Sequence, residues 1–350
     1  MFKHLLVLIV FSLILISCGE KNNQPEKNLT DKEKYTFDST DIKTEGVDNS
    51  GKPFLIQYKF SKGDKFTYRL TTISDNTQKI TIDTSITSNV NQRVVYLLDL
   101  NVKEVDEEGN TEVEMKISSL KLDALANGQT FSFEAGKDKD TSKIKQFAEF
   151  QALYNNPFSV RFNKKGEVLE VYKADKISNK FLELRGAIDT ISAEDKNFVK
   201  QDLINSVLNP LVTQIIRKVP EKQVYKDSTW EMQQKPVTMM VYQINYVNKY
   251  KLESVEKLKD DRIAVIDAGI SFTFTGQPKV TQGSVTYNFQ KPLSTAEGKI
   301  FFNVDKGIQI KSRTKTKLEL TYSMEANTPK GKQKGKRTDV VGNTNILELL

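Results

Sequence analysis

The sequence predicts an α+β fold in which a helical segment separates two related antiparallel β lobes. Three observations lead to this prediction. Alternating apolar residues indicate strands over residues 54–172, apolar residues at three- and four-residue spacing indicate helices over 173–220, and strand patterns return over 221–350. The two strand sets also share an order of motifs, which is typical of an internal duplication.

Residues 1–17 contain the parts of a secretory signal. Lys3 supplies a positive charge near the start, an apolar run follows over 5–16, and the small residue Ser17 precedes Cys18. This run is too short to cross a bilayer as a mature helix, so cleavage between Ser17 and Cys18 is expected. The Leu-x-Ser-Cys ending resembles the bacterial lipobox. That resemblance implies acyl chains on the Cys18 thiol and a membrane anchor through those chains.

Residues 18–53 are nearly free of bulky apolar side chains, with Tyr35 and Phe37 as their only aromatic residues. A stretch of this composition buries too little apolar surface to offset the entropy of ordering its chain. We therefore expect a flexible tether between the anchor and the folded part.

The first lobe is expected over residues 54–172. Within it, every second residue of the stretch 96–102 is apolar and shares one face, as in a half-buried antiparallel strand. The acidic turn 106–110 then reverses the chain into the next strand. A short apolar stripe at helical spacing over 144–153 ends before Pro157.

The segment 173–220 is predicted to be helical because its apolar residues recur at helical spacing. Ser192 followed by Asp195 resembles a capping box that begins a helix. Pro210 is expected to kink or break this helix, because proline lacks a backbone N–H group. Packing against a sheet is the first interpretation of the apolar stripe, and lining of a cavity is the alternative.

The second lobe, residues 221–350, repeats motifs of the first. Residues 101–105 match 251–255 at an offset of 150. Further matches are Val113 with Ile263 at the same offset, and 162–166 with 302–307 and 63–66 with 227–230 at other offsets. Insertions in loops of a duplicated unit would preserve the order of elements in this way. The alternative is that any β meander with glycine turns resembles itself.

One histidine and one cysteine in the whole chain exclude several classes of chemistry. His4 lies in the signal, and Cys18 is the expected lipidation site. The mature chain then lacks imidazole and free thiol, which excludes Ser-His-Asp and Cys-His catalysis, histidine or thiolate zinc sites and disulfides. Carboxylate, lysine, serine or tyrosine chemistry and oxygen-ligated cations remain. We expect no enzyme activity, no cofactor and no metal site.

The formal net charge of +7 comes from interspersed charges of both signs. Such a surface keeps a protein soluble, and attraction to anionic membrane surfaces is the alternative interpretation. Nucleic acid is not expected as a partner, because the signal directs the chain out of the cytoplasm.

Two acidic pairs and the single tryptophan are the candidate chemical residues. Asp138 with Asp140, and Asp260 with Asp261, lie in predicted turns, where aspartate favours local backbone hydrogen bonds. Trp230 is interpreted as a core anchor, with a sugar platform as the alternative.

An aromatic row and a basic segment have two interpretations each. The row consists of Tyr242, Ile244, Tyr246, Tyr250 and Leu252, which share one strand face. These side chains could line an apolar groove or pack beneath a helix. The basic segment 329–337 is interpreted as a solvated hairpin loop that guards an edge, with binding of acidic lipids as the alternative.

Three motifs, in residues 62–68, 219–230 and 297–302, resemble an uncharacterised lipoprotein family of Bacteroidota with a domain of unknown function. The resemblance implies an envelope location and no assigned activity. Surface export in that phylum tends to follow an acidic cluster after the cysteine, and here Glu20 is the one acid, so we expect the periplasmic face of the outer membrane. The order of elements is also similar to lipoprotein carriers that fold a curved antiparallel sheet under a helical lid.

Three hypotheses for the function follow. The first is a non-enzymatic lipoprotein that binds or carries an apolar or amphipathic envelope molecule. The second is a structural or protein-interaction lipoprotein with solid cores. The third and most remote is a hydrolase that uses carboxylate chemistry.

Overall fold

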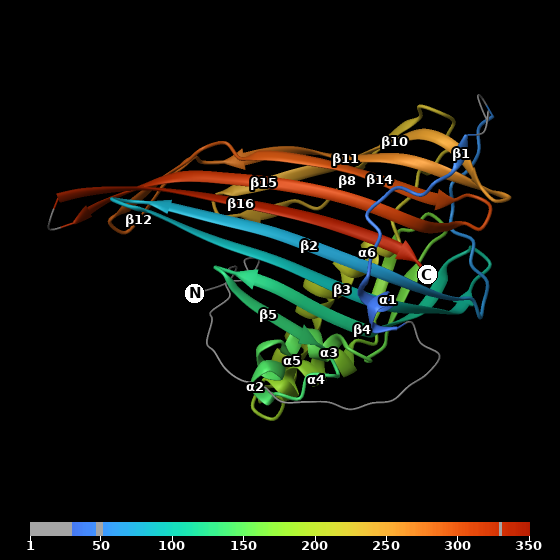
Figure 1. Ribbon diagram of the computed structural model, residues 1–350, viewed down its shortest axis with the longest axis horizontal. Helices are drawn as coiled ribbons and strands as arrows, with labels where there is room; N and C mark the ends of the chain where they lie inside the picture. The colour runs from blue at the N-terminus through green and yellow to red at the C-terminus, as the bar shows by residue number, and fades with distance from the viewer. Residues whose placement is uncertain (1–29, 47–51, 329–330) are drawn as a thin grey trace.

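The computed structural model describes residues 30–46, 52–328 and 331–350, which form a 16-stranded antiparallel sheet with a small group of helices (Figure 1). The neighbouring strands follow the order β1-β10-β11-β14-β15-β16-β2-β3-β4-β6-β7. Strand β5 adds to β4, β8 and β9 add to β10, and β13 joins β12 to β15. The predicted antiparallel strands are therefore confirmed, but the chain is mostly β rather than α+β.

The strand bounds are β1 Glu45–Gly46, β2 Lys65–Thr81, β3 Ser85–Val105, β4 Thr111–Ala126, β5 Gln129–Glu134, β6 Phe158–Phe162, β7 Val168–Tyr172, β8 Thr229–Gln233, β9 Val237–Met239, β10 Tyr242–Leu258, β11 Asp261–Gly276, β12 Lys279–Gln282, β13 Val285–Phe289, β14 Leu293–Asn303, β15 Ile308–Thr328 and β16 Gly331–Leu349.

The strands of the two predicted lobes belong to one continuous sheet, and β16 joins them. This strand pairs with β15 of the second strand set and with β2 of the first, along most of its length in both cases. Its side chains alternate between two half-buried faces, so its sequence contains no signal for which strands flank it. Joining by the last strand is the reason why the two sets form one sheet.

Helices α2 to α6 and the π-helical turn η1 lie on one face of this sheet, and α2, α3, α4 and α5 are seen below β5 in Figure 1. Their bounds are α2 Thr141–Gln146, α3 Ala148–Leu153, α4 Asp175–Leu184, α5 Ala193–Leu203, η1 Ile204–Leu208 and α6 Asn209–Ile215. A main core forms where Leu208, Val212 and Ile215 pack with residues of both strand sets, such as Leu98 and Leu252. We call the face that carries these residues the inner face and the opposite one the outer face.

Two details of the helical segment test predictions made from the sequence. The predicted helix start at Ser192 is confirmed, because the Ser192 hydroxyl is the N-cap and accepts a hydrogen bond from the Asp195 backbone N–H at 3.1 Å. Of the kink or break expected at Pro210, the break is not found, because α5, η1 and α6 follow one another without a gap. The π-helical turn η1 ends at Leu208, two residues before Pro210. Its wider backbone hydrogen bonds lie in the turn that proline crowds and from which proline removes a donor.

The N-terminal segment, residues 30–46, lies across the outer face and includes α1 Asp31–Tyr35 (Figure 1). The Tyr35 hydroxyl donates to Glu134 at 2.7 Å, and the Lys311 ammonium contacts Asp38 at 2.9 Å. Ile42 packs on a small apolar cluster of the outer face, and β1 pairs with β10. These residues are part of the stretch 18–53 predicted to be a tether, and they are bound to the sheet.

The two strand sets share backbone details at matching positions. Gly63 N–H donates to the Val102 carbonyl at 2.9 Å, and Asp227 N–H donates to the Leu252 carbonyl at 2.8 Å. Both donors have a positive φ, 92° for Gly63 and 67° for Asp227. Irregularities in register also recur, between Val102 and Glu104 and between Leu252 and Ser254, then between Arg161 and Phe162 and between Phe301 and Phe302.

Candidate functional site

The inner face continues beyond the main core as a partly exposed surface. In its centre, directly paired residues of β2, β16, β15 and β14 form two rows of small side chains. The rows are Thr72, Asn345, Thr314 and Gly298, then Ser74, Asn343, Thr316 and Ala296. All eight are partly exposed, so they form a floor on which another molecule can lie.

An aromatic cluster borders this floor on the side of β10 and β11. Its members are Tyr242, Tyr246, Phe272, Phe274, Tyr287, Phe289 and Tyr322. The rings contact one another in a chain, with centroid distances of 6.3 Å for Tyr246 to Phe272 and 4.9 Å for Phe289 to Tyr322. Tyr246, Phe272 and Phe274 are nevertheless partly exposed. Rings that stack on each other and still face solvent offer apolar surface to a ligand.

The predicted aromatic row is part of this arrangement. Tyr242 and Tyr246 belong to the aromatic cluster, whereas Leu252 belongs to the main core beneath the helices. Both interpretations therefore apply to different parts of the row. Its Leu252 end packs beneath the helices, and its Tyr242–Tyr246 end belongs to a partly exposed apolar surface. Burial raises the pKa of the Tyr242 and Tyr246 hydroxyls, which therefore stay neutral at physiological pH.

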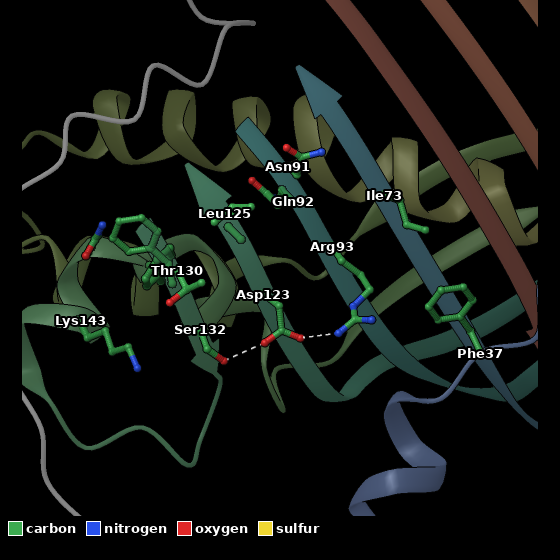
Figure 2. Close-up of a pocket in the computed structure, with 14 residues that line it drawn as sticks. Phe37, Ile73, Asn91, Gln92, Arg93, Asp123, Leu125, Thr130, Ser132 and Lys143 are labelled. Atoms are coloured by element: carbon green, nitrogen blue, oxygen red, sulfur yellow. Dashed lines mark hydrogen bonds and ion pairs between the residues drawn. The ribbon is translucent and has the colours of Figure 1, made fainter. Parts of the chain in front are cut away.

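A pocket of about 790 Å³ is lined by residues of β2, β3, β4, β5 and α2 and by Phe37 of the N-terminal segment (Figure 2). Its size is within the range of about 300 to 1,000 Å³ that small-molecule sites occupy. The apolar part of its lining consists of Phe37, Ile73, Ala124, Leu125, Phe131 and Phe147. Phe37 comes from the N-terminal segment, so that segment contributes to the pocket wall.

The polar wall of the pocket contains one charged pair. Arg93 Nη2 donates to Asp123 Oδ2 at 2.8 Å, and the Ser132 hydroxyl donates to Asp123 Oδ1 at 2.9 Å (Figure 2). Burial alone would raise the pKa of Asp123, but the hydrogen bonds from Arg93 and Ser132 hold it below its usual value. A carboxylate with a lowered pKa and engaged oxygens is a poor general acid.

A second polar group lies where the chain leaves α6. Arg217 Nη2 donates to the Gln214 side-chain oxygen at 2.6 Å, and the Arg217 backbone N–H donates to the Tyr58 hydroxyl at 2.8 Å. The Trp230 ring stacks on Tyr250 at 5.5 Å. Trp230, predicted to be a core anchor, packs against the main core. Arg217 was not predicted, because nothing local distinguishes it from the basic residues that commonly end a helix.

The predicted acidic pairs serve local structure. Asp138 accepts a hydrogen bond from the Glu134 backbone and pairs with Lys143 at 2.9 Å. Asp140 caps α2. Asp261 pairs with Lys306 at 2.7 Å.

The signal-peptide residues, including Ser17 and Cys18, lie outside the described residues. In the part of the chain that the structure describes, no helix combines the length and apolar character needed to span a bilayer.

These features define a large antiparallel-sheet protein with a partly exposed apolar inner face. The chain belongs to DUF6263, a family of unknown function whose model matches residues 108–309, more than half of the sequence. The predicted membership of a family of unknown function is thus confirmed, whereas its lipoprotein character stays a prediction. None of the curated proteins matches this chain.

Two solved structures show distant similarity. One, described as "Lipid-protein interactions in lipovitellin", has 11% identity and a TM-score of 0.44, and the match covers 83% of this chain and 25% of that one. This chain thus spans about a quarter of the length of the lipovitellin chain. The other is an outer membrane channel from Pseudomonas putida F1, with 6% identity, a TM-score of 0.20 and coverage of 84% and 97%.

Proposed function

We propose that this protein binds and carries an apolar or amphipathic molecule on the inner face of its sheet. The observation that supports this proposal is the aromatic cluster beside a floor of small residues, with Tyr246, Phe272 and Phe274 partly exposed. Each square ångström of apolar surface removed from water contributes about 25 cal/mol. A molecule that covers these rings would bind for this reason, and the small floor residues leave room for it.

We further propose that the protein acts without catalysis, in the cell envelope. The sequence supports the location through the signal over 1–17 and the lipobox-like ending at Cys18. Acyl chains on Cys18 would hold the sheet at the membrane, where apolar cargo is available. The periplasmic face of the outer membrane remains the expected location.

The proposed binding is tested by native mass spectrometry of residues 18–350 with Cys18→Ser, a form that keeps every described residue and lacks acyl chains. We expect co-purifying lipid on this protein and its loss from the double variant Phe272→Ser, Phe274→Ser. Leu293→Ser is the matched control, because Leu293 lies on the outer face and is 65% exposed. Protein free of lipid, with the inner face covered by another polypeptide, would support the interaction hypothesis and contradict carriage.

We also propose that the two strand sets arose by duplication. The shared hydrogen bonds of Gly63 and Asp227 and the recurring register irregularities support this origin. Superposition of β2, β3, β4, β6 and β7 on β8, β10, β11, β14 and β15 should align these features together. A superposition that places them at different strand positions would contradict the duplication.

A further inference from the structure

We propose that the inner face contains a site for the anionic head group of its ligand, formed by Arg217, Trp230 and Tyr250. The ligand would then be an anionic amphiphile with a carboxylate or phosphate head and an apolar tail. This inference rests on the function proposed above and names the class of molecule that is bound.

Arg217 carries a positive charge that no described carboxylate balances. Its guanidinium donates to the neutral Gln214 side chain, and the groups that act on its pKa, besides burial, are the hydroxyls of Tyr250 and Tyr58. Burial lowers the pKa of Arg217, but an arginine side chain stays protonated at neutral pH. Glu221, in the same stretch of chain, pairs instead with Lys218, at 3.6 Å. An anion from outside the protein would supply the missing charge.

Two buried donors at this place also lack an acceptor among the described residues. They are Nε of Arg217 and Nε1 of Trp230. Both side chains adjoin Tyr250, since its hydroxyl acts to raise the pKa of Arg217 and its ring stacks on Trp230 at 5.5 Å. Buried polar groups are normally satisfied, so two unsatisfied donors around one tyrosine point to an acceptor that binds there. Carboxylate and phosphate oxygens accept such hydrogen bonds strongly.

The site is continuous with the surface proposed for the tail. Tyr250 and Tyr246 lie on the same face of β10, and Tyr246 stacks on Phe272 at the start of the aromatic cluster. The two tyrosines are four positions apart on the strand, which is about 13 Å at about 3.3 Å per residue. A head group at Arg217 would therefore let an alkyl chain extend along β10 over the exposed rings.

Trp230 is the only tryptophan of the chain, so its fluorescence reports on this site directly. The experiment titrates residues 18–350, with Cys18→Ser, with dodecyl phosphate, with dodecanol and with inorganic phosphate. We expect dodecyl phosphate to change Trp230 emission and bind more tightly than dodecanol, and inorganic phosphate to have no effect at the same concentrations. Arg217→Gln should weaken dodecyl phosphate binding by about 10- to 100-fold, the range for a hydrogen bond to a charged group.

Three further variants make the result specific. Lys218→Gln removes the same charge one residue away and should leave dodecyl phosphate binding unchanged. Arg217→Lys should recover part of the affinity if Arg217→Gln acts through charge, and circular dichroism checks that both variants are folded. Trp230→Phe keeps a ring for stacking and removes the N–H donor, so calorimetry should find weaker binding of dodecyl phosphate and unchanged binding of dodecanol.

The failure of this inference differs from the failure of the proposed function. Equal binding of dodecyl phosphate and dodecanol, with no effect of Arg217→Gln, would overturn the head-group site and leave carriage intact. Binding of neither alkyl probe would overturn both. If inorganic phosphate binds as tightly as dodecyl phosphate, the site binds free anions, and the proposal that its ligand is an amphiphile is overturned.

Discussion

Arg69 Nε donates to Glu348 Oε2 at 2.9 Å, and this ion pair connects β2 to the last strand, β16. Both side chains are largely buried, with exposed fractions of 11% and 10%. Glu348 also accepts a hydrogen bond from the Asp38 backbone N–H at 3.2 Å, which adds the N-terminal segment to the same contact. The pair thus lies where the two strand sets and the N-terminal segment meet.

Removing one partner of this pair should destabilise the protein strongly. Glu348→Ala leaves the Arg69 charge buried and unpaired, for which we expect a loss of about 3 kcal/mol in the free energy of unfolding. Urea denaturation measures this change. Glu231→Gln is the control, because its pair with Lys249 is exposed and should contribute less than about 1 kcal/mol. Equal stability of the Glu348→Ala variant and the wild type would contradict the role of this contact.

The attachment of residues 30–46 should depend on pH. The hydrogen bond from Lys311 is the main cause that lowers the pKa of Asp38. Because the folded pKa lies below the unfolded one, the pair stabilises the protein above about pH 4, and this contribution disappears as the pH falls further. Asp38→Asn should therefore expose Lys34 and Lys43 to trypsin near neutral pH. A segment that resists trypsin equally in both proteins would argue against the contact.

Gly166 and Gly307, which occupy matching turns, should not tolerate a side chain. Each has a positive φ, and a Cβ atom would lie 2.3 Å from the Arg217 carbonyl oxygen at Gly166 and 2.5 Å from the Lys59 backbone nitrogen at Gly307. Gly283 has a similar φ of 60° but open space around it. Gly283→Ala should cost about 1 kcal/mol from the backbone alone, and Gly166→Ala and Gly307→Ala clearly more. Similar melting temperatures for all three variants would contradict the close approach.

Lipidation at Cys18 should be lost with its thiol. Cys18→Ala should abolish labelling of the protein by radioactive palmitate, because the expected acyl acceptor is removed. The protein should also retain its signal segment. Labelling that persists in this variant would exclude Cys18 as the anchor.

Local sequence patterns predicted the antiparallel strands and the helical segment, because alternation and helical spacing depend on neighbouring residues alone. The interpretation of 329–337 as a loop is wrong for residues 331–337, which begin β16. Local patterns did not predict that β16 joins the two strand sets, since pairing partners depend on residues far apart in the chain. The offset of 150 made Val113 equivalent to Ile263 in the second repeat. In the structure Val113 pairs with Val102, and Leu252, the equivalent of Val102, pairs with Ile266 instead of Ile263. The hairpin of β10 and β11 therefore contains more residues between these partners than the hairpin of β3 and β4, and a single offset cannot account for this difference.

The candidate site was also predictable only where it depends on the pattern within one strand. The aromatic row on β10 followed from strand alternation, but Phe289 and Tyr322 join it through pairing of β13 with β15. Arg217 could not be found from the sequence, because its surroundings of Tyr58, Gln214 and Tyr250 come from separate parts of the chain.

The central claim, that an apolar or amphipathic molecule binds on the inner face, is tested most directly by photocrosslinking. A dodecyl probe with a diazirine group near the chain end would be activated on residues 18–350 with Cys18→Ser, and the labelled peptides identified by mass spectrometry. We predict labels on Tyr246, Phe272 and Phe274. Labels confined to outer-face residues such as Leu293, or no labelled peptide, would contradict the account.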